Sequence, residues 1–187
     1  MKRIIVGISG ATGAIYGVRA LMQLRGMPDV ETHLVVTESG LKTLEMEVDM
    51  PLSAIAALAH ASHDAKDVAA PVASGSFPAD GMIVAPCSVR SLSAIAYGQT
   101  DTLLARAADC ILKQRRPLVL MLREAPLHAG HIRSMQMVTE MGGIVFPASP
   151  VFYTKPQGIE AMVDETVARA LDLLGIQTKA LKRWRAS

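Results

Sequence analysis

The sequence predicts an α/β fold, with a doubly wound, mostly parallel sheet flanked by helices. Short apolar runs alternate with helix-like segments along nearly the whole chain, which is the order of a parallel sheet covered on both faces. The first apolar run passes directly into glycines and a helix, in MKRIIVGISGATGAIYG. With right-handed crossovers, this fold is Rossmann-like or flavodoxin-like, and its ligands bind beyond the carboxyl ends of the strands.

Five short runs rich in aliphatic residues predict strands over Lys2–Ser9, Glu31–Thr37, Gly81–Ala85, Pro117–Leu122 and Ile144–Phe146. We expect Pro86 and Pro147 to end the third and the last of these strands. Apolar residues at helical spacing predict helices over Gly13–Arg25, Glu38–Glu47, Pro51–His60, Ser88–Tyr97, Leu103–Gln114, His128–Met141 and Gly158–Leu174. The segment Ser62–Pro78, rich in Ala, Ser, Asp and Pro, is expected to be a surface excursion.

Length and composition favour one globular domain over residues 1–187, because half of the 187 residues are hydrophobic and only 19% are charged. A net charge of +2 and an aromatic content of 4% argue against nucleic acid as a partner.

The chain shows no targeting or membrane signal, because no apolar run approaches about 18 residues and no signal-peptide pattern opens it. We therefore expect a cytoplasmic protein that does not bind membranes. Cys87 and Cys110 are far apart in the sequence and are expected to be reduced thiols. No cysteine or histidine spacing matches a metal site, so no metal is expected.

The glycine loop after the first strand predicts a phosphate or nucleotide site. Its spacing is GxxGxxG, through Gly7, Gly10 and Gly13, and it opens a helix whose N–H groups and positive end suit a phosphate. Thr37 ends the second predicted strand and Glu38 follows it, and there a hydroxyl suits a mononucleotide and a carboxylate suits a ribose. The alternative is a tight strand-to-helix turn without a ligand.

A second loop follows the third predicted strand and begins Pro86-Cys87-Ser88. Ser88 is placed to cap the next helix, and Arg90 could contact a phosphate or the edge of a flavin. Beside the glycine loop, these residues read as a second wall of one pocket. Alone, they would be a capping serine and a solvated arginine.

Unusual charges occur on one predicted helix and after the strand that follows it. Arg106 and Lys113 are seven residues apart and share one helix face, and Arg123-Glu124 comes directly after an apolar strand. Cations converging there would hold a doubly charged phosphate, and the carboxyl could pass a proton. The alternative for Arg106 and Lys113 is an ordinary surface pair.

The segments GISGATGAIYG, the PCS loop, RAADCILKQRRPLVLMLREAPLH and PVFYTKPQ closely resemble the UbiX family of flavin prenyltransferases, from Met1 to about Trp184. The resemblance implies a metal-independent transferase that joins a dimethylallyl group from dimethylallyl monophosphate to N5 and C6 of reduced FMN. It also implies that a UbiD-type decarboxylase receives the prenylated FMN, and that the protein is a homododecamer with sites between subunits. In such an assembly we expect the tail, about residues 176–187, to pack on a neighbouring subunit.

The resemblance also assigns residues. It implies that the flavin is bound by Gly10, Ala11, Thr12, Gly13, Thr37, Ser88 and Arg123, to which the second loop adds Arg90. It implies that the prenyl phosphate is gripped by Arg106, Lys113, Tyr153 and Arg169. The expected catalytic residues are Glu47, Glu124, Lys113, Ser88 and Trp184, of which Trp184 lines the dimethylallyl pocket.

The chain departs from the family pattern at two places. The loop reads GATG where the family often has GASG, which keeps the hydroxyl, and Leu122 stands where the family has a proline before Arg-Glu.

Two other functions stay open. An FMN-dependent decarboxylase of the phosphopantothenoylcysteine type would need an early catalytic histidine, and His33, His60 and His63 lie in no matching motif. A non-catalytic flavin carrier would not need the clustered cations and Glu124.

Overall fold

A computed structural model describes residues 1–184 of the chain. Its centre is a six-stranded sheet in which every neighbouring pair is parallel, in the order β3-β2-β1-β4-β5-β6. The strands are β1 Lys2–Ile8, β2 Val30–Val36, β3 Ala61–His63, β4 Gly81–Cys87, β5 Leu118–Leu122 and β6 Ile144–Pro147. This is the strand order of a Rossmann sheet, so the predicted fold class is confirmed.

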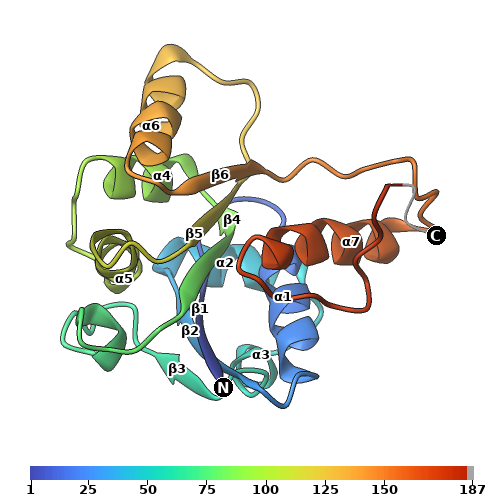
Figure 1. The fold of residues 1–187 in the computed structure, drawn as a ribbon, viewed down its shortest axis with the longest axis horizontal. Coiled ribbons are helices and arrows are strands. Elements are labelled where there is room, and N and C mark those ends of the chain that lie inside the picture. The colour runs from blue at the N-terminus through green and yellow to red at the C-terminus, as the bar shows by residue number, and fades with distance from the viewer. Residues whose placement is uncertain (185–187) are drawn as a thin grey trace.

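Helices cover both faces of this sheet, with α4, α5 and α6 on one side and α1 and α7 on the other (Figure 1). The helices are α1 Ile15–Arg25, α2 Glu38–Glu47, α3 Leu52–Ala56, α4 Val89–Ala96, α5 Leu103–Lys113, α6 Ala129–Glu140 and α7 Ile159–Asp172. Alternate residues of β1 and β4 enter the two apolar cores, as expected for strands buried on both faces.

Two sequence predictions about the strands are wrong. Pro86 does not end β4, which continues to Cys87 after a register shift and pairs with Leu122. The shift accommodates a residue without an N–H donor, and the Pro86 carbonyl instead accepts the N–H of Ser9 at 3.2 Å. In addition, Ala61–His63 forms the edge strand β3 at the start of the expected surface excursion.

Strands β1 and β4 lie side by side, and the chain leaves them toward opposite faces, through α1 and α4. The buried Ser9 side chain joins the two exits, because its Oγ donates to the Pro86 carbonyl at 2.9 Å and accepts the Ser88 N–H at 2.8 Å. Ligands of open α/β sheets bind at such a reversal of strand order. The fold therefore places the two loops singled out in the sequence at one point.

Gly17 allows α1 to approach the sheet closely, because a Cβ there would lie 2.3 Å from the Ala85 carbonyl oxygen. We expect Gly17→Ala to lower the free energy of unfolding by about 1–3 kcal/mol through overpacking, as measured by urea denaturation. Gly26→Ala is the matched control, since Gly26 caps the same helix at φ −73° and its Cβ would be 3.7 Å from the nearest atom. Equal losses in the two variants would contradict the close-packing explanation.

Candidate active site

A cleft of about 330 Å³ opens at the carboxyl ends of β1, β4 and β5, formed by the loops that follow these strands. Its lining includes Gly10, Ala11, Thr12, Ser39, Ser88, Arg90, Arg123 and Glu124. A second hollow of about 340 Å³ shares Ser39 and Arg90 with it and is also lined by Thr37. The structure therefore brings together the residues expected from both loops, together with Arg123 and Glu124.

The hydroxyl groups of Thr37 and Ser88 cap two helices at these hollows. Thr37 Oγ1 accepts the N–H of Gly40 at 3.0 Å at the start of α2, and Ser88 Oγ accepts the N–H of Ser91 at 3.2 Å at the start of α4. Each cap satisfies one of the unpaired N–H groups of its helix, and the positive helix ends remain. The two helix ends and Arg90 favour an anion, whereas the carboxylates of Glu38 and Asp101 in the second hollow and of Glu124 in the first oppose one close to them.

Glu47 occupies the start of α1, where the glycine spacing predicts a phosphate. Its carboxylate accepts the N–H groups of Gly13 at 2.7 Å and Ala14 at 2.9 Å. Partial burial opposes ionisation, but hydrogen bonds from Thr12, Ala14 and Gly13 and the charge of Arg123 hold the pKa of Glu47 below its ordinary value. A ligand phosphate at this edge would therefore meet the ends of α2 and α4 rather than these two N–H groups.

Arg123 follows β5 and supplies positive charge between the cleft and α1. Its N–H donates to the Cys87 carbonyl at 3.2 Å, which fixes the strand exit although Leu122 replaces the family proline. Burial raises the pKa of the Tyr16 phenol, and the charge of Arg123 acts against that rise. The adjacent Glu124 carboxylate accepts the N–H of Ala125 at 3.0 Å. A cation and a carboxylate thus stand side by side at the cleft.

Tyr153, Arg169 and Trp184 form a second group of expected site residues. Arg169 Nη1 donates to the Tyr153 hydroxyl at 2.9 Å, and the rings of Tyr153 and Trp184 meet edge to face with centroids 4.9 Å apart. Tyr153 and Trp184 also line a hollow of about 750 Å³ beside the tail. They are 39% and 62% exposed in the single chain. The structure therefore assembles an arginine, a phenol and an indole from three distant segments.

Arg106 and Lys113 do not join Arg123 within one chain. Arg106 Nε donates to the Ala73 carbonyl at 3.0 Å, and its Nη1 pairs with Asp109 at 2.8 Å. Lys113 ends α5 at the amino edge of the sheet, whereas Arg123 follows β5 at the carboxyl edge. The five residues of β5 separate these edges by about 17 Å at roughly 3.3 Å per residue. The convergence expected of these cations is therefore absent from the isolated chain.

The tail lies against its own chain over the residues that the structure describes. Ile176 is buried, Thr178 donates to Gln23 on α1 at 2.8 Å, and Arg183 pairs with Asp172 on α7 at 2.9 Å. The expectation that the tail packs on a neighbouring subunit stays a prediction, and its last part, residues 185–187, lies outside the described residues.

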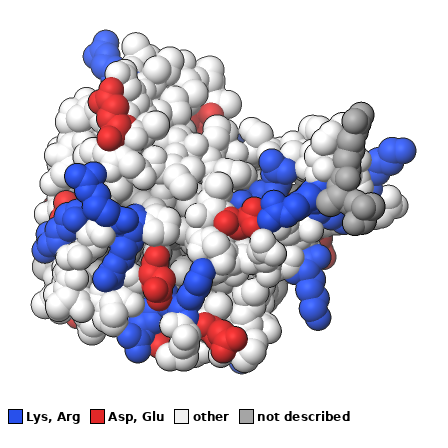
Figure 2. All heavy atoms as spheres, in the orientation of Figure 1, with Lys and Arg blue, Asp and Glu red and all other residues white. Residues whose placement is uncertain are grey.

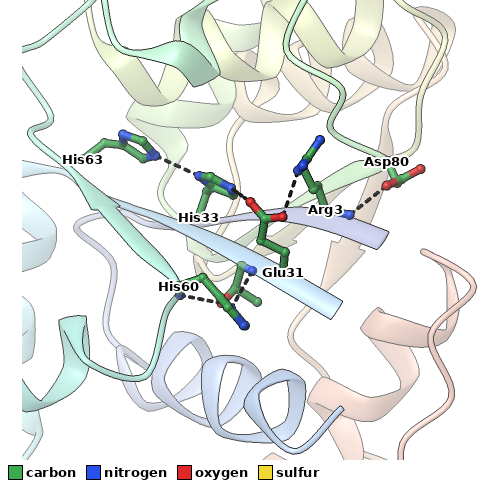
Figure 3. Close-up of polar contacts among 7 residues, drawn as sticks. Arg3, Glu31, His33, His60, His63 and Asp80 are labelled. Carbon is green, nitrogen blue, oxygen red and sulfur yellow. Dashed lines mark hydrogen bonds and ion pairs between the residues drawn. The ribbon is translucent and has the colours of Figure 1, made fainter. Parts of the chain in front are cut away.

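The early histidines lie in the sheet (His33 and His63) or directly before strand β3 (His60), and not at the cleft. Figure 3 shows His33 of β2 between Glu31 and His63, with distances of 2.9 Å to Glu31 Oε1 and 3.0 Å to His63 Nε2. Hydrogen bonds from His33 and Arg3 lower the pKa of Glu31, and burial and the nearby His33 lower that of His63. His60 instead contacts Thr32. None of these histidines lines the two hollows at the carboxyl edge.

The remaining chemistry-bearing groups point to no other centre. Among residues 1–184, no cluster of three or more His, Cys, Asp and Glu side chains could hold a metal ion, and no helix is long and apolar enough to cross a membrane. Cys87 and Cys110 are buried and unpaired, and burial raises the pKa of Cys87 to about 12. On the face drawn in Figure 2, Lys and Arg form separate groups with Asp and Glu between them.

Sequence reasoning missed Ser39 and Ser9. Ser39 lines both hollows. A Cβ on residue 10 would lie 2.3 Å from the Cβ of Ser39, so only glycine fits at position 10. The available signal was its position in the first turn of the helix capped by Thr37, which turns it toward the same edge. Ser9 could have been found from the glycine loop, as the last polar residue before Gly10.

A sheet of this order with a polar, cationic cleft at its reversal point defines a nucleotide-binding type of α/β protein. Residues 1–177 match the family model described as Flavoprotein. The chain is 52% identical over 176 residues to the flavin prenyltransferase UbiX of Escherichia coli strain K12, covering 94% of this chain and 93% of that protein. The chain belongs to the UbiX family of flavin prenyltransferases.

Two solved structures resemble the chain along its length. One is AnUbiX (PadA1) in complex with FMN and dimethylallyl pyrophosphate, with a TM-score of 0.96 and 47% identity, covering 100% of this chain and 98% of that chain. The other is a dodecameric FMN-dependent UbiX-like decarboxylase from Escherichia coli O157:H7, with a TM-score of 0.95 and 44% identity, covering 98% and 100%. The resemblance stated from the sequence and the prediction of a flavoprotein enzyme are confirmed.

Proposed function

We propose that the chain transfers a dimethylallyl group from dimethylallyl monophosphate to N5 and C6 of reduced FMN and releases inorganic phosphate. The observation that carries this proposal is the cleft at the carboxyl edge, where Arg123 and Glu124 meet the glycine loop in a member of the UbiX family. Bound FMN would supply the two nucleophilic atoms. The residues of the chain would hold FMN, orient the prenyl phosphate, exclude water and move a proton.

The cleft and its neighbour suit FMN, which carries a phosphate on a polar chain and a flat aromatic ring. Two capped helix ends and the cations of Arg90 and Arg123 favour the phosphate, and Gly10 lets backbone approach closely. We assign FMN binding to Gly10, Ala11, Thr12, Gly13, Thr37, Ser88, Arg90 and Arg123. Glu47 would hold the glycine loop in shape through its two backbone hydrogen bonds.

Arg169 and Tyr153 would bind the prenyl phosphate, because their hydrogen bond places a cation and a phenol at one point. Leaving-group oxygens need positive charge in the transition state, and a dry aromatic wall suits the allylic cation. Trp184 would supply that wall beside Tyr153. The cleft of the single chain is lined by none of the expected phosphate and prenyl residues, Arg106, Lys113, Tyr153, Arg169 and Trp184. We therefore propose that both groups complete a cleft shared with neighbouring copies in a homododecamer.

Glu124 would move the proton, because it lies at the cleft beside Arg123, where the flavin edge and the phosphate would meet. Ser88 would stay close to the reacting edge as part of the second loop. We further propose that residues 1–187 act as one domain in the cytoplasm, and that a UbiD-type decarboxylase receives the prenylated FMN.

The proposal is tested by incubating the purified protein with reduced FMN and dimethylallyl monophosphate without oxygen. We expect the flavin mass to increase by one prenyl group while inorganic phosphate is released. A parallel reaction with the diphosphate tests which leaving group the chain prefers, and a reaction without the prenyl donor is the control. Flavin that binds while its mass never changes would instead favour a flavin carrier.

A further inference from the structure

Helix α7 is attached to α1 through Asp164, the residue before Glu165. Arg19 forms a bidentate ion pair with Asp164, in which the Nε–Oδ1 distance is 2.6 Å and the Nη2–Oδ2 contact is also short. Gln23 adds a hydrogen bond to the Asp164 carbonyl at 3.0 Å. This part of α7 is therefore a fixed platform for the side chains that follow it.

Glu165, the next residue on α7, is a buried carboxylate with a partner outside its helix. Glu165 is only 4% exposed, and its Oε2 accepts a short hydrogen bond from the Thr154 hydroxyl. Its Oε1 has no hydrogen-bond partner among the residues that the structure describes. A buried carboxylate without hydrogen bonds is costly in free energy. The hydrogen bond to Glu165 therefore strongly favours the observed position of Thr154.

Thr154 lies in a tight turn that needs such an anchor. The N–H of Lys155 donates to the Phe152 carbonyl at 3.0 Å, so Tyr153 and Thr154 are the two central residues of the turn. Lys155 has φ +51°, in the left-handed region that side chains disfavour. The turn is therefore held in an unfavourable backbone conformation by contacts from outside it.

Arg169 lies one helical turn beyond Glu165, so both side chains project from the same face of α7. They contact consecutive residues of the turn, Glu165 through Thr154 and Arg169 through the Tyr153 hydroxyl. We propose that Glu165 is a positioning residue for phosphate binding. Through Thr154 it fixes the turn so that Tyr153 meets Arg169 before the phosphate monoester arrives, a role that rests on the proposed function of that pair.

The experiment compares Thr154→Val, which removes only the anchoring hydroxyl, with the matched Thr166→Val in the full chain. Thr166 is also on α7 and 1% exposed, but its hydroxyl donates to the Met162 carbonyl of its own helix and not to the turn. Trp184 is the single tryptophan of the chain and touches Tyr153. Its fluorescence therefore reports binding of inorganic phosphate to the flavin-free protein, independently of catalysis.

We expect Thr154→Val to raise the Kd for phosphate and the KM for dimethylallyl monophosphate about tenfold, as the loss of one hydrogen bond to a charged group would. The kcat and the affinity for FMN should stay at the wild-type values, and Thr166→Val should match wild type throughout. Glu165→Leu should behave as Thr154→Val does, whereas Glu165→Gln should approach wild type because an amide oxygen still accepts from Thr154.

Wild-type Kd and KM values in Thr154→Val and Glu165→Leu would overturn the inference. So would equal losses in Thr154→Val and Thr166→Val, which would indicate a general weakening of α7, and so would wild-type Trp184 fluorescence that ignores phosphate. A wild-type protein that responds to phosphate but never prenylates FMN would overturn the proposed function alone, and the phosphate titrations would still decide the role of Glu165.

Discussion

Glu124→Gln is expected to slow prenyl transfer by about 10²–10⁴-fold, the range for removal of a general acid–base group, while FMN still binds with nearly wild-type affinity. Glutamine keeps the size of the side chain and an oxygen that can accept the Ala125 N–H, now bonded at 3.0 Å. It cannot take up or deliver a proton in the way a carboxylate does. Anaerobic single turnovers followed by flavin mass, together with FMN titrations, separate the two effects.

The matched control for this change is Glu140→Gln. Glu140 ends α6, where its carboxylate is exposed and accepts a hydrogen bond from Gln136 at 2.8 Å, and it does not line the cleft. Its turnover should equal that of wild type. If Glu124→Gln also turned over at the wild-type rate, Glu124 would have no part in the mechanism. A parallel loss of FMN binding would make it a cofactor residue instead.

The sheet could be predicted because each buried strand is a compact apolar run between helices. The cleft could be predicted because the topology of the sheet determines which loops lie next to one another. Strand β3 could not be predicted, since its three residues carry no measurable period. Pro86 was misread for a different reason. A register shift at Ala85–Pro86 is a tertiary feature of the β4–β5 pair, and local sequence rules treat proline only as a strand breaker.

In the candidate site, too, local features could be predicted from the sequence and long-range contacts could not. Thr37 and Ser88 are local caps, so the sequence indicates them directly. The contact of Glu47 with the N–H groups of Gly13 and Ala14 joins residues more than thirty positions apart, and no spacing rule indicates it. Lys113 illustrates another limit, because helical periodicity gives the face of α5 that carries it but not the edge of the sheet where that helix ends.

Arg169→Met is expected to lower kcat/KM for dimethylallyl monophosphate by about 10²–10³-fold, as loss of one preorganised charge on a leaving group does. Arg169 donates to the Tyr153 hydroxyl through Nη1 at 2.9 Å, and a guanidinium has further N–H groups for phosphate oxygens. Methionine keeps much of the apolar stem, so α7 should remain packed. The rate is measured by phosphate release under anaerobic conditions.

Two further variants are compared with Arg169→Met, one at its hydrogen-bond partner and one as a matched control. Tyr153→Phe removes the hydroxyl but leaves the ring against Trp184, so its kcat/KM should fall by about tenfold, the lower end of the effect of one hydrogen bond to a charged group. Arg133→Met changes an exposed arginine of α6 in the same way and should behave as wild type. An Arg169→Met variant with wild-type kcat/KM would place the leaving phosphate elsewhere. The positive charge on the leaving phosphate would then have to come from the cleft arginines Arg90 and Arg123 and from Arg106 and Lys113. The same assay on variants of Arg106 and Lys113 measures the contribution of the latter two.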